Sequence, residues 1–96
     1  MDKIIESLTL ETLLENLAEM TLYLEAAASV CYRTAHDGET ALIVLQDARN
    51  GLIDAIADVN VAAEAVRRKM GISCDEIAEA EDAKIESWRR RVENGI

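Results

Sequence analysis

Two pairs of carboxylates with the same spacing are the residues of this sequence best suited to chemistry. Glu15 and Glu19 lie four residues apart, and so do Asp54 and Asp58. In a helix, this spacing places both members of a pair on one face. Their stripes consist otherwise mostly of apolar or small residues, and the plainly polar stripes lie elsewhere. Because an unpaired buried carboxylate is strongly destabilising, something positive must compensate these charges.

On neighbouring helices, the two pairs would surround one space with four hard oxygen ligands. Mg²⁺ and Mn²⁺ prefer carboxylate and water oxygens, and they usually share their coordination sphere with substrate phosphates. Inward-facing carboxylates are a known way to build a metal site in a helical bundle. Two other arrangements remain open: ion pairs between these acids and Lys or Arg of a partner chain, or exposure of the acids in a groove.

Apolar residues spaced by three and four predict the two long helices that carry these acids. The first runs from about Thr9, or already from Asp2, to about Arg33. A loop over residues 34–38 follows, in which Asp37 can cap the next helix. The core-facing stripe of the first helix is expected to be Leu10, Leu14, Leu17, Thr21, Leu24, Ala28 and Cys31.

The second helix is expected over residues 39–70. Gly51 within it could mark a kink, a close helix crossing or the start of the metal-binding part. Its end is well signalled, because Arg67–Lys69 suit a helix C-terminus and Gly71 suits the left-handed position after it. Its apolar face is expected to be Leu45, Leu52, Ile56, Val59, Ala63 and Val66.

A third, shorter helix opens with a capping box in which Ser73 is the N-cap and Glu76 reaches back. Its inward-facing residues are expected to be Ile77, Ile85, Trp88 and Val92. The 96 residues form one domain, and the lack of proline favours long helices. Three helices cannot enclose a bundle core unaided, so we expect a single all-α domain over residues 1–96 that completes a helical bundle as a homodimer or homotetramer.

Composition and charge narrow the function. Nineteen acidic against ten basic residues give a net charge of −9, which disfavours duplex nucleic acid as a partner. The same acidity suits divalent cations, or simply maintains solubility. Cys31 and Cys74 allow one disulfide by count but form no zinc motif, and His36 stands alone without a catalytic triad. Without a signal peptide or a membrane-spanning apolar segment, we expect a cytoplasmic protein with reduced thiols.

Two stretches of the chain carry family-like motifs. The first reads Leu13-Leu-Glu-Asn-Leu-Ala-Glu-Met20. The second reads Leu52-Ile-Asp-Ala-Ile-Ala-Asp-Val59 and continues to the turn Gly71-Ile-Ser73 and to Lys84-Ile-Glu-Ser-Trp-Arg89. These stretches resemble the MazG-like all-α nucleoside triphosphate pyrophosphohydrolases over residues 11–33 and 49–92. That family carries Leu-Leu-Glu-Glu-x-Ala-Glu-Leu and Glu-Glu-x-x-Asp-Val motifs, a Gly-Ile/Leu-Ser/Asp turn and a Lys-x-x-x-Trp/Arg pattern.

The resemblance implies Mg²⁺- or Mn²⁺-dependent hydrolysis of a nucleoside triphosphate between its α- and β-phosphates, giving a monophosphate and pyrophosphate. By position, Glu15, Glu19 and Asp58 match the family's acidic metal ligands, and Asp54 takes the place of an acid beside them. Glu15 and Glu19 are also the expected catalytic residues.

Two departures from the family weaken the expected activity. Asn16 and Ala55 stand where the family has a second consecutive Glu in each motif. Fewer negative ligands lower the affinity for Mg²⁺. The alternatives are therefore a degenerate MazG-like protein that binds nucleotide or metal without turnover, or a purely structural helical oligomer.

The expected substrate-binding residues are Lys84, Trp88 and Arg89. Lys84 is the preferred phosphate contact because it lies in mid-helix, where the helix macrodipole does not explain a cation. Arg89–Arg91, or Arg67–Lys69 of a partner chain, could also meet the triphosphate, although cations at helix C-termini commonly offset the macrodipole. Trp88 and Tyr23 either stack on a base or pack in the core or an interface.

Overall fold

The computed structural model describes residues 1–37 and 42–95, without the side chains of residues 37 and 42–45. Every regular element in this part of the chain is a helix: α1 (Asp2–Ser7), α2 (Leu10–Asp37), α3 (Leu42–Lys69) and α4 (Cys74–Glu93). The predicted all-α class is confirmed for these residues. None of the described helices combines the length and the apolar character that a membrane span requires.

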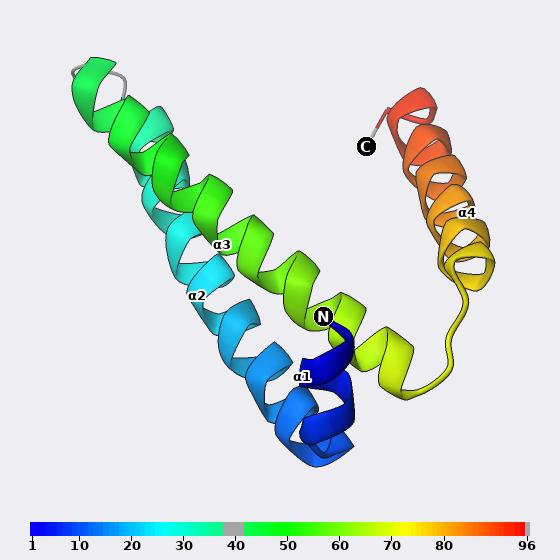
Figure 1. The fold of residues 1–96 in the computed structure, drawn as a ribbon. Helices are drawn as coiled ribbons and strands as arrows, with labels where there is room; N and C mark the ends of the chain where they lie inside the picture. The colour runs from blue at the N-terminus through cyan, green and yellow to red at the C-terminus, as the bar shows by residue number, and fades with distance from the viewer. Residues whose placement is uncertain (38–41, 96) are drawn as a thin grey trace.

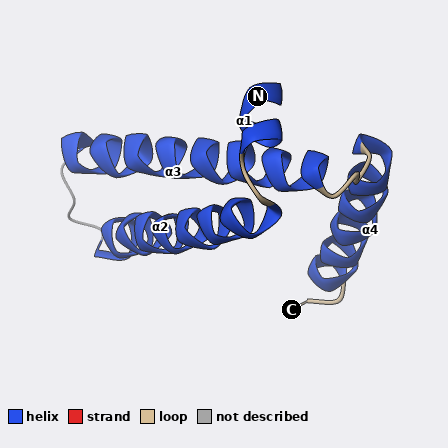
Figure 2. Ribbon diagram, turned by 60° about the horizontal axis from the view of Figure 1, so that its bottom comes forward, coloured by secondary structure: helices blue, strands red, loops and turns tan. Residues whose placement is uncertain are grey.

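The helices form a V with unequal arms (Figure 1). One arm is an antiparallel hairpin of α2 and α3, and α1 lies across the end of α3 that is far from the hairpin loop (Figure 2). The other arm is α4 alone, which packs along no other described helix. The chain is therefore more open than a compact monomer, with a radius of gyration of 16.9 Å against about 12.5 Å expected for its length.

The contact between α2 and α3 is built from residues at alternating steps of four and three, the spacing of a coiled coil. Its centre of packing is Leu13, only 3% exposed, which lies against Ala65 and Val66. The buried and half-buried residues along the contact are Leu13, Leu17, Met20, Leu24, Ala27 and Cys31 of α2, and Ala48, Leu52, Ala55, Val59, Ala62 and Val66 of α3.

The predicted core stripes of α2 and α3 are correct at eight of the twelve positions whose side chains are described. Of the expected stripe on α2, Leu10, Leu17, Leu24 and Cys31 are half-buried, but Leu14, Thr21 and Ala28 are exposed. On α3, Ile56 is exposed, whereas Leu52, Val59, Ala63 and Val66 face inward as expected, and Leu45 lies outside the described side chains. The contact is rotated toward the alanines of α3, and Ala55, Ala62 and Ala65 are buried.

The expectation that α4 packs inward is wrong for a single chain. Ile77, Ile85, Trp88 and Val92 are all exposed, and α4 has no buried residue. The physical reason is that no other described helix lies along α4 to cover its apolar side.

The helix boundaries also need two corrections. The described residues form four helices in place of the expected three, because the chain leaves helical geometry at Leu8 (φ −109°, ψ 146°). Thr9 then caps α2, since its side-chain oxygen accepts a hydrogen bond from the Thr12 amide at 3.2 Å. The expected loop at residues 34–37 is helical, so Asp37 belongs to α2. The expected cap formed by its side chain lies outside the described residues. Residues 38–41 of the expected loop and second helix lie outside the description.

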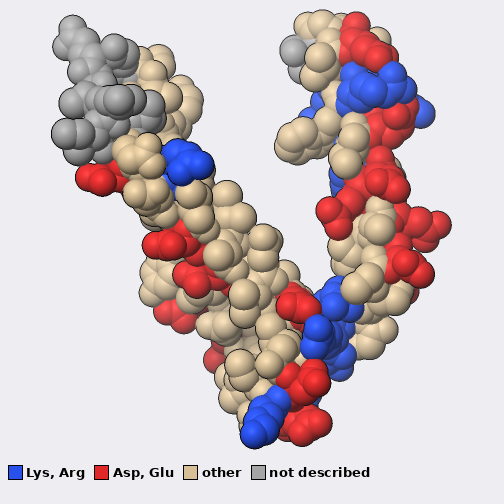
Figure 3. Space-filling view, turned by 45° about the horizontal axis from the view of Figure 1, so that its top comes forward, with Lys and Arg blue, Asp and Glu red and all other residues tan. Residues whose placement is uncertain are grey.

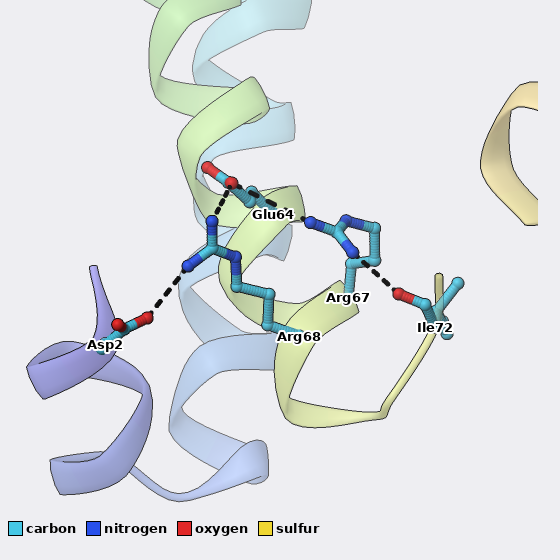
Figure 4. Close-up of polar contacts among 5 residues, drawn as sticks. All are labelled: Asp2, Glu64, Arg67, Arg68 and Ile72. Carbon is cyan, nitrogen blue, oxygen red and sulfur yellow. Dashed lines mark hydrogen bonds and ion pairs between the residues drawn. The ribbon is translucent and has the colours of Figure 1, made fainter. Parts of the chain in front are cut away.

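The turn between α3 and α4 follows the sequence prediction closely. Gly71 has φ +72°, and the Ile72 amide donates to the Arg67 carbonyl at 2.9 Å, as in a Schellman motif. The Arg67 guanidinium reaches forward to the Ile72 carbonyl at 2.8 Å (Figure 4). The predicted capping box is confirmed, with Ser73 and Glu76 each accepting a hydrogen bond from the other's amide, at 3.1 and 2.7 Å. Both sides of the turn are thereby fixed.

The basic residues at the end of α3 hold α1 in place. Arg68 bridges Asp2 at 3.0 Å and Glu64 at 2.8 Å (Figure 4). Lys69 donates to the Ile5 carbonyl at 2.7 Å. These cations therefore have intramolecular partners besides the macrodipole of α3.

Gly51 and Gly71 are expected to respond oppositely to alanine. A Cβ at Gly51 would meet nothing within 4 Å, so a close helix crossing is not the reason for this glycine. Gly51→Ala should raise the free energy of unfolding by about 0.5–1 kcal/mol, because alanine favours a helix interior. Gly71→Ala should lower it by about 1 kcal/mol, because its positive φ disfavours any side chain. Urea denaturation of the two variants checks both signs, and a loss of stability in Gly51→Ala would contradict the first.

Candidate functional site

The register of the hairpin sets the level of each candidate acid along its axis. The Cys31 thiol contacts the Ala48 carbonyl at 3.2 Å, so those residues lie side by side. In an antiparallel pair, Asp58 is then level with Thr21, two residues or about 3 Å along the axis from Glu19. Glu19 and Asp58 are therefore the members of the two pairs that lie nearest in level.

The other two members of the pairs, Glu15 and Asp54, lie at opposite ends of the site. By the same register, Glu15 is level with Glu64 of α3, about 15 Å along the axis from Asp54. All four predicted ligands are exposed. Within residues 1–37 and 42–95, no three His, Cys, Asp or Glu side chains gather closely enough to hold a metal ion. The structure thus brings two of the four predicted ligands to one level and spreads the other two.

Glu19 and Asp58 also share a flank of the hairpin. Near the hairpin loop, Val30 of α2 and Asp47 of α3 line one hollow, which shows which flanks of the helices meet. Helical steps of three and four lead from Val30 to Tyr23 and Glu19, and from Asp47 to Asp58. We refer to this side of the hairpin as the acidic flank, defined by Glu19, Tyr23, Asp47, Asp54 and Asp58.

Tyr23 is the partner of Glu19, a role that spacing could have revealed. Its hydroxyl donates to Glu19 Oε1 at 2.8 Å, four residues away on the same helix. This hydrogen bond, followed by the negative charge of Glu19, raises the pKa of the Tyr23 phenol above its usual value. Tyr23 therefore orients the carboxylate by a polar contact, whereas the sequence suggested base stacking or packing for it.

The two residues that depart from the family pattern lie differently in the hairpin. Ala55 is 7% exposed and faces α2, so it leaves no ligand at the contact between the helices. Asn16 is exposed, one turn from Glu19 on α2. Its amide oxygen can thus reach the acidic flank, whereas Ala55 contributes only packing.

The donor set fits Mg²⁺ bound together with a phosphate ligand. Mg²⁺ keeps several waters and is commonly held by one or two carboxylates plus substrate phosphates. Glu19 and Asp58 can supply such a pair. A site made by protein ligands alone does not fit, because no third candidate ligand gathers with them in the described residues.

The predicted substrate-binding residues lie on α4, away from the acidic flank. Lys84 and Trp88 line an open groove along α4. Arg89 is engaged on its own helix, with Glu86 and Glu93 both at 2.6 Å. These hydrogen bonds lower the pKa of Glu86 and raise that of Arg89. A single chain therefore does not bring these three residues together with the acids.

Comparison of the chain with protein-family models, with curated proteins and with solved structures yields no match. The acidic flank and the two family-like stretches are therefore the features of this chain that bear on its function.

Ionisation of Tyr23 is expected to report on its contact with Glu19. The raised pKa means that this contact stabilises the fold below the unfolded phenol's pKa of 10.0, and that this contribution is lost as the pH rises through the folded-state pKa. In a Tyr32→Phe background, an absorbance titration follows Tyr23 alone. Adding Glu19→Gln should move its midpoint to lower pH, and an unchanged midpoint would show that the hydrogen bond does not form.

Proposed function

We propose that this chain is a MazG-like nucleoside triphosphate pyrophosphohydrolase that works with Mg²⁺ or Mn²⁺ and acts as a homo-oligomer. The observation that carries the proposal is the position of Glu19 and Asp58. The two acids belong to separate family-like motifs, yet the hairpin brings them to nearly one level on one flank. Neither has an ion-pair partner among the described residues, so their charge is available to a cation.

The residues at and beside the acidic flank have different proposed roles. When bound, Mg²⁺ supplies charge neutralisation of the phosphates. Glu19 and Asp58 are the proposed ligands, with Glu15 and Asp54 on either side along the axis. Glu15 and Glu19 are the proposed bases for the attacking water, and the Tyr23 hydroxyl fixes one oxygen of Glu19. Hydrolysis gives a nucleoside monophosphate and pyrophosphate.

The basic side chains that contact the triphosphate cannot belong to α4 of the same chain, because α4 does not approach the acidic flank. Lys84, Trp88 and Arg89 remain the proposed substrate contacts only if a partner chain delivers them. Self-association is thus part of the proposal.

Exposed surface supports self-association independently. The chain exposes 7525 Å², whereas a compact monomer of 10.6 kDa is expected to expose about 5,500 Å². A typical stable interface buries about 800 Å² per partner. The excess is large enough to supply such an interface without any change in the fold.

The buried position of Ala55 favours a second candidate, a relative that binds nucleotide or metal without turnover. Ala55 lies in the contact between α2 and α3, where a family glutamate would add a negative ligand. With that ligand missing, weak metal binding can persist while catalysis fails.

Thermal unfolding with metal and nucleotide separates these candidates. A ligand that binds only the folded state raises the melting temperature by mass action. We expect millimolar Mg²⁺ or Mn²⁺ with a non-hydrolysable nucleoside triphosphate to raise it, and pyrophosphate release to appear with hydrolysable triphosphates. Binding without release would support the second candidate.

The control variants keep the size of each side chain. Glu19→Gln and Asp58→Asn should abolish the shift and the pyrophosphate release. Glu25→Gln should retain both, since Glu25 lines a different hollow on α2. Wild-type turnover in Glu19→Gln or Asp58→Asn, or no shift with any metal and nucleotide, would refute the proposed site.

A further inference from the structure

An open groove runs along α4. It is lined by Ile77, Ala80, Glu81, Lys84, Ile85 and Trp88. Trp88 is 67% exposed and Ile85 65% exposed, although they are among the largest apolar residues of the chain. Figure 3 shows uncharged side chains along the side of α4 that faces the hairpin, interrupted by acidic and basic ones. Such a strip on a helix that packs against no other described helix is typical of an interaction surface.

The hairpin of the same chain is a poor occupant, because the turn holds α4 away from it. The Schellman bonds of Gly71 and Ile72, the Arg67 contact and the capping box of Ser73 fix the turn on both sides. Ile77, at the start of α4, lines a hollow together with residues of α3. In the described residues, α4 makes no helix-to-helix contact with the hairpin.

The charges of α4 match those of a second α4 running in the opposite direction. The first half of the helix carries five acids and no base, namely Asp75, Glu76, Glu79, Glu81 and Asp82. The second half carries Lys84 and Arg89–Arg91 against Glu86 and Glu93. An antiparallel pair therefore places each acidic half beside a basic half, whereas a parallel pair would place like charges together.

The groove is also complementary to itself. A two-fold axis between Asp82 and Ala83 brings Glu81 level with Lys84 of the partner subunit. The same axis brings Ile77 level with Trp88 of the partner subunit. In a two-fold interface each contact occurs twice. In this one register, each Glu81 therefore meets a Lys84, and the large apolar residues are covered.

We propose that α4 pairs antiparallel with α4 of a second copy of this chain, through Ile77, Glu81, Lys84 and Trp88. This pairing rests on the self-association proposed above and does not require nucleotide hydrolysis. Because it covers Lys84 and Trp88, it excludes these two residues as contacts for the triphosphate while the helices are paired. It covers Trp88, the only tryptophan of the chain, so the fluorescence of the unlabelled protein reports it directly.

Charge reversal across the two-fold axis tests the pairing. Glu81→Lys and Lys84→Glu each place two like-charge contacts in the dimer, and each should weaken dimerisation by about tenfold. The double variant restores opposite charges and should recover most of the affinity. Glu79→Lys makes the same change on the opposite face of α4 and should leave dimerisation within about twofold.

Sedimentation equilibrium measures the affinity, and dilution followed by Trp88 emission confirms which surface is covered. We expect wild-type emission to move to longer wavelength as the dimer dissociates.

A dimer that neither single reversal weakens would overturn the pairing while leaving self-association intact. A monomer at all concentrations would overturn both, and a monomer with buried Trp88 would show that α4 closes on its own hairpin. Pyrophosphate release is assayed separately, through Glu19 and Asp58.

Discussion

Replacing Leu13 with alanine is expected to lower the free energy of unfolding by about 2–4 kcal/mol. Leu13 is 3% exposed and packs against Ala65 and Val66, with Ile5 and Leu17 beside it. Truncation would remove apolar contacts and leave a cavity at the point where α1, α2 and α3 meet. Because small domains are only marginally stable, such a loss would leave a substantial unfolded fraction at ambient temperature. Urea denaturation followed by circular dichroism measures the change.

The adjacent leucine provides the matched control. Leu14 is 43% exposed, so Leu14→Ala should lower the free energy of unfolding by less than about 1 kcal/mol under identical conditions. The sequence pattern had assigned the core position to Leu14. Equal losses in the two variants, at the same protein concentration, would show that the contact between α2 and α3 is rotated from the position described.

A glutamate at position 55, as in the MazG-like motif that this sequence resembles, is expected to lower the free energy of unfolding in the absence of metal. Ala55→Glu inserts a long charged side chain into the contact between α2 and α3, where the alanine is 7% exposed. Overpacking and loss of hydration together should lower the free energy of unfolding by about 2–4 kcal/mol. If the acidic flank binds Mg²⁺, the new carboxylate gains a cation and millimolar Mg²⁺ should recover part of the loss.

Ala57→Glu is the control for this experiment, because Ala57 is exposed on the same helix. It should change the stability by less than about 0.5 kcal/mol, with or without Mg²⁺. Thermal unfolding of the parent, Ala55→Glu and Ala57→Glu proteins, in chelator and in Mg²⁺, measures these changes in stability. An Ala55→Glu protein as stable as the parent in chelator would contradict the packing described for α3. Destabilisation without any recovery in Mg²⁺ would argue against a metal site at this flank.

Local signals in the sequence predicted the turn between α3 and α4 correctly. Gly71 and the Ser73–Glu76 capping box act through backbone geometry and short-range hydrogen bonds, which do not depend on the rest of the fold. The ends of the first loop were harder to predict. Residues 34–37 contain no proline or glycine to stop a helix, and α2 continues through them.

The rotation of the hairpin contact could not be predicted from periodicity. Leu10, Leu17 and Leu24 are compatible with either of two neighbouring stripes on α2. The small side chains of Ala55 and Ala62 favour the observed one, and this preference exists only when both helices are considered together. The same limit applies to the acids, because spacing within a helix places Glu15 beside Glu19 but says nothing of their level relative to Asp54 and Asp58.

The openness of the V has a consequence for the order of folding. The hairpin contacts join two helices that are neighbours in the chain, so this arm can form in a unimolecular step with a small loop-closure entropy. The apolar side of α4 packs against no other described helix and would be covered only in a later bimolecular encounter. Refolding should therefore show a fast phase independent of protein concentration and a slower phase whose rate increases with it.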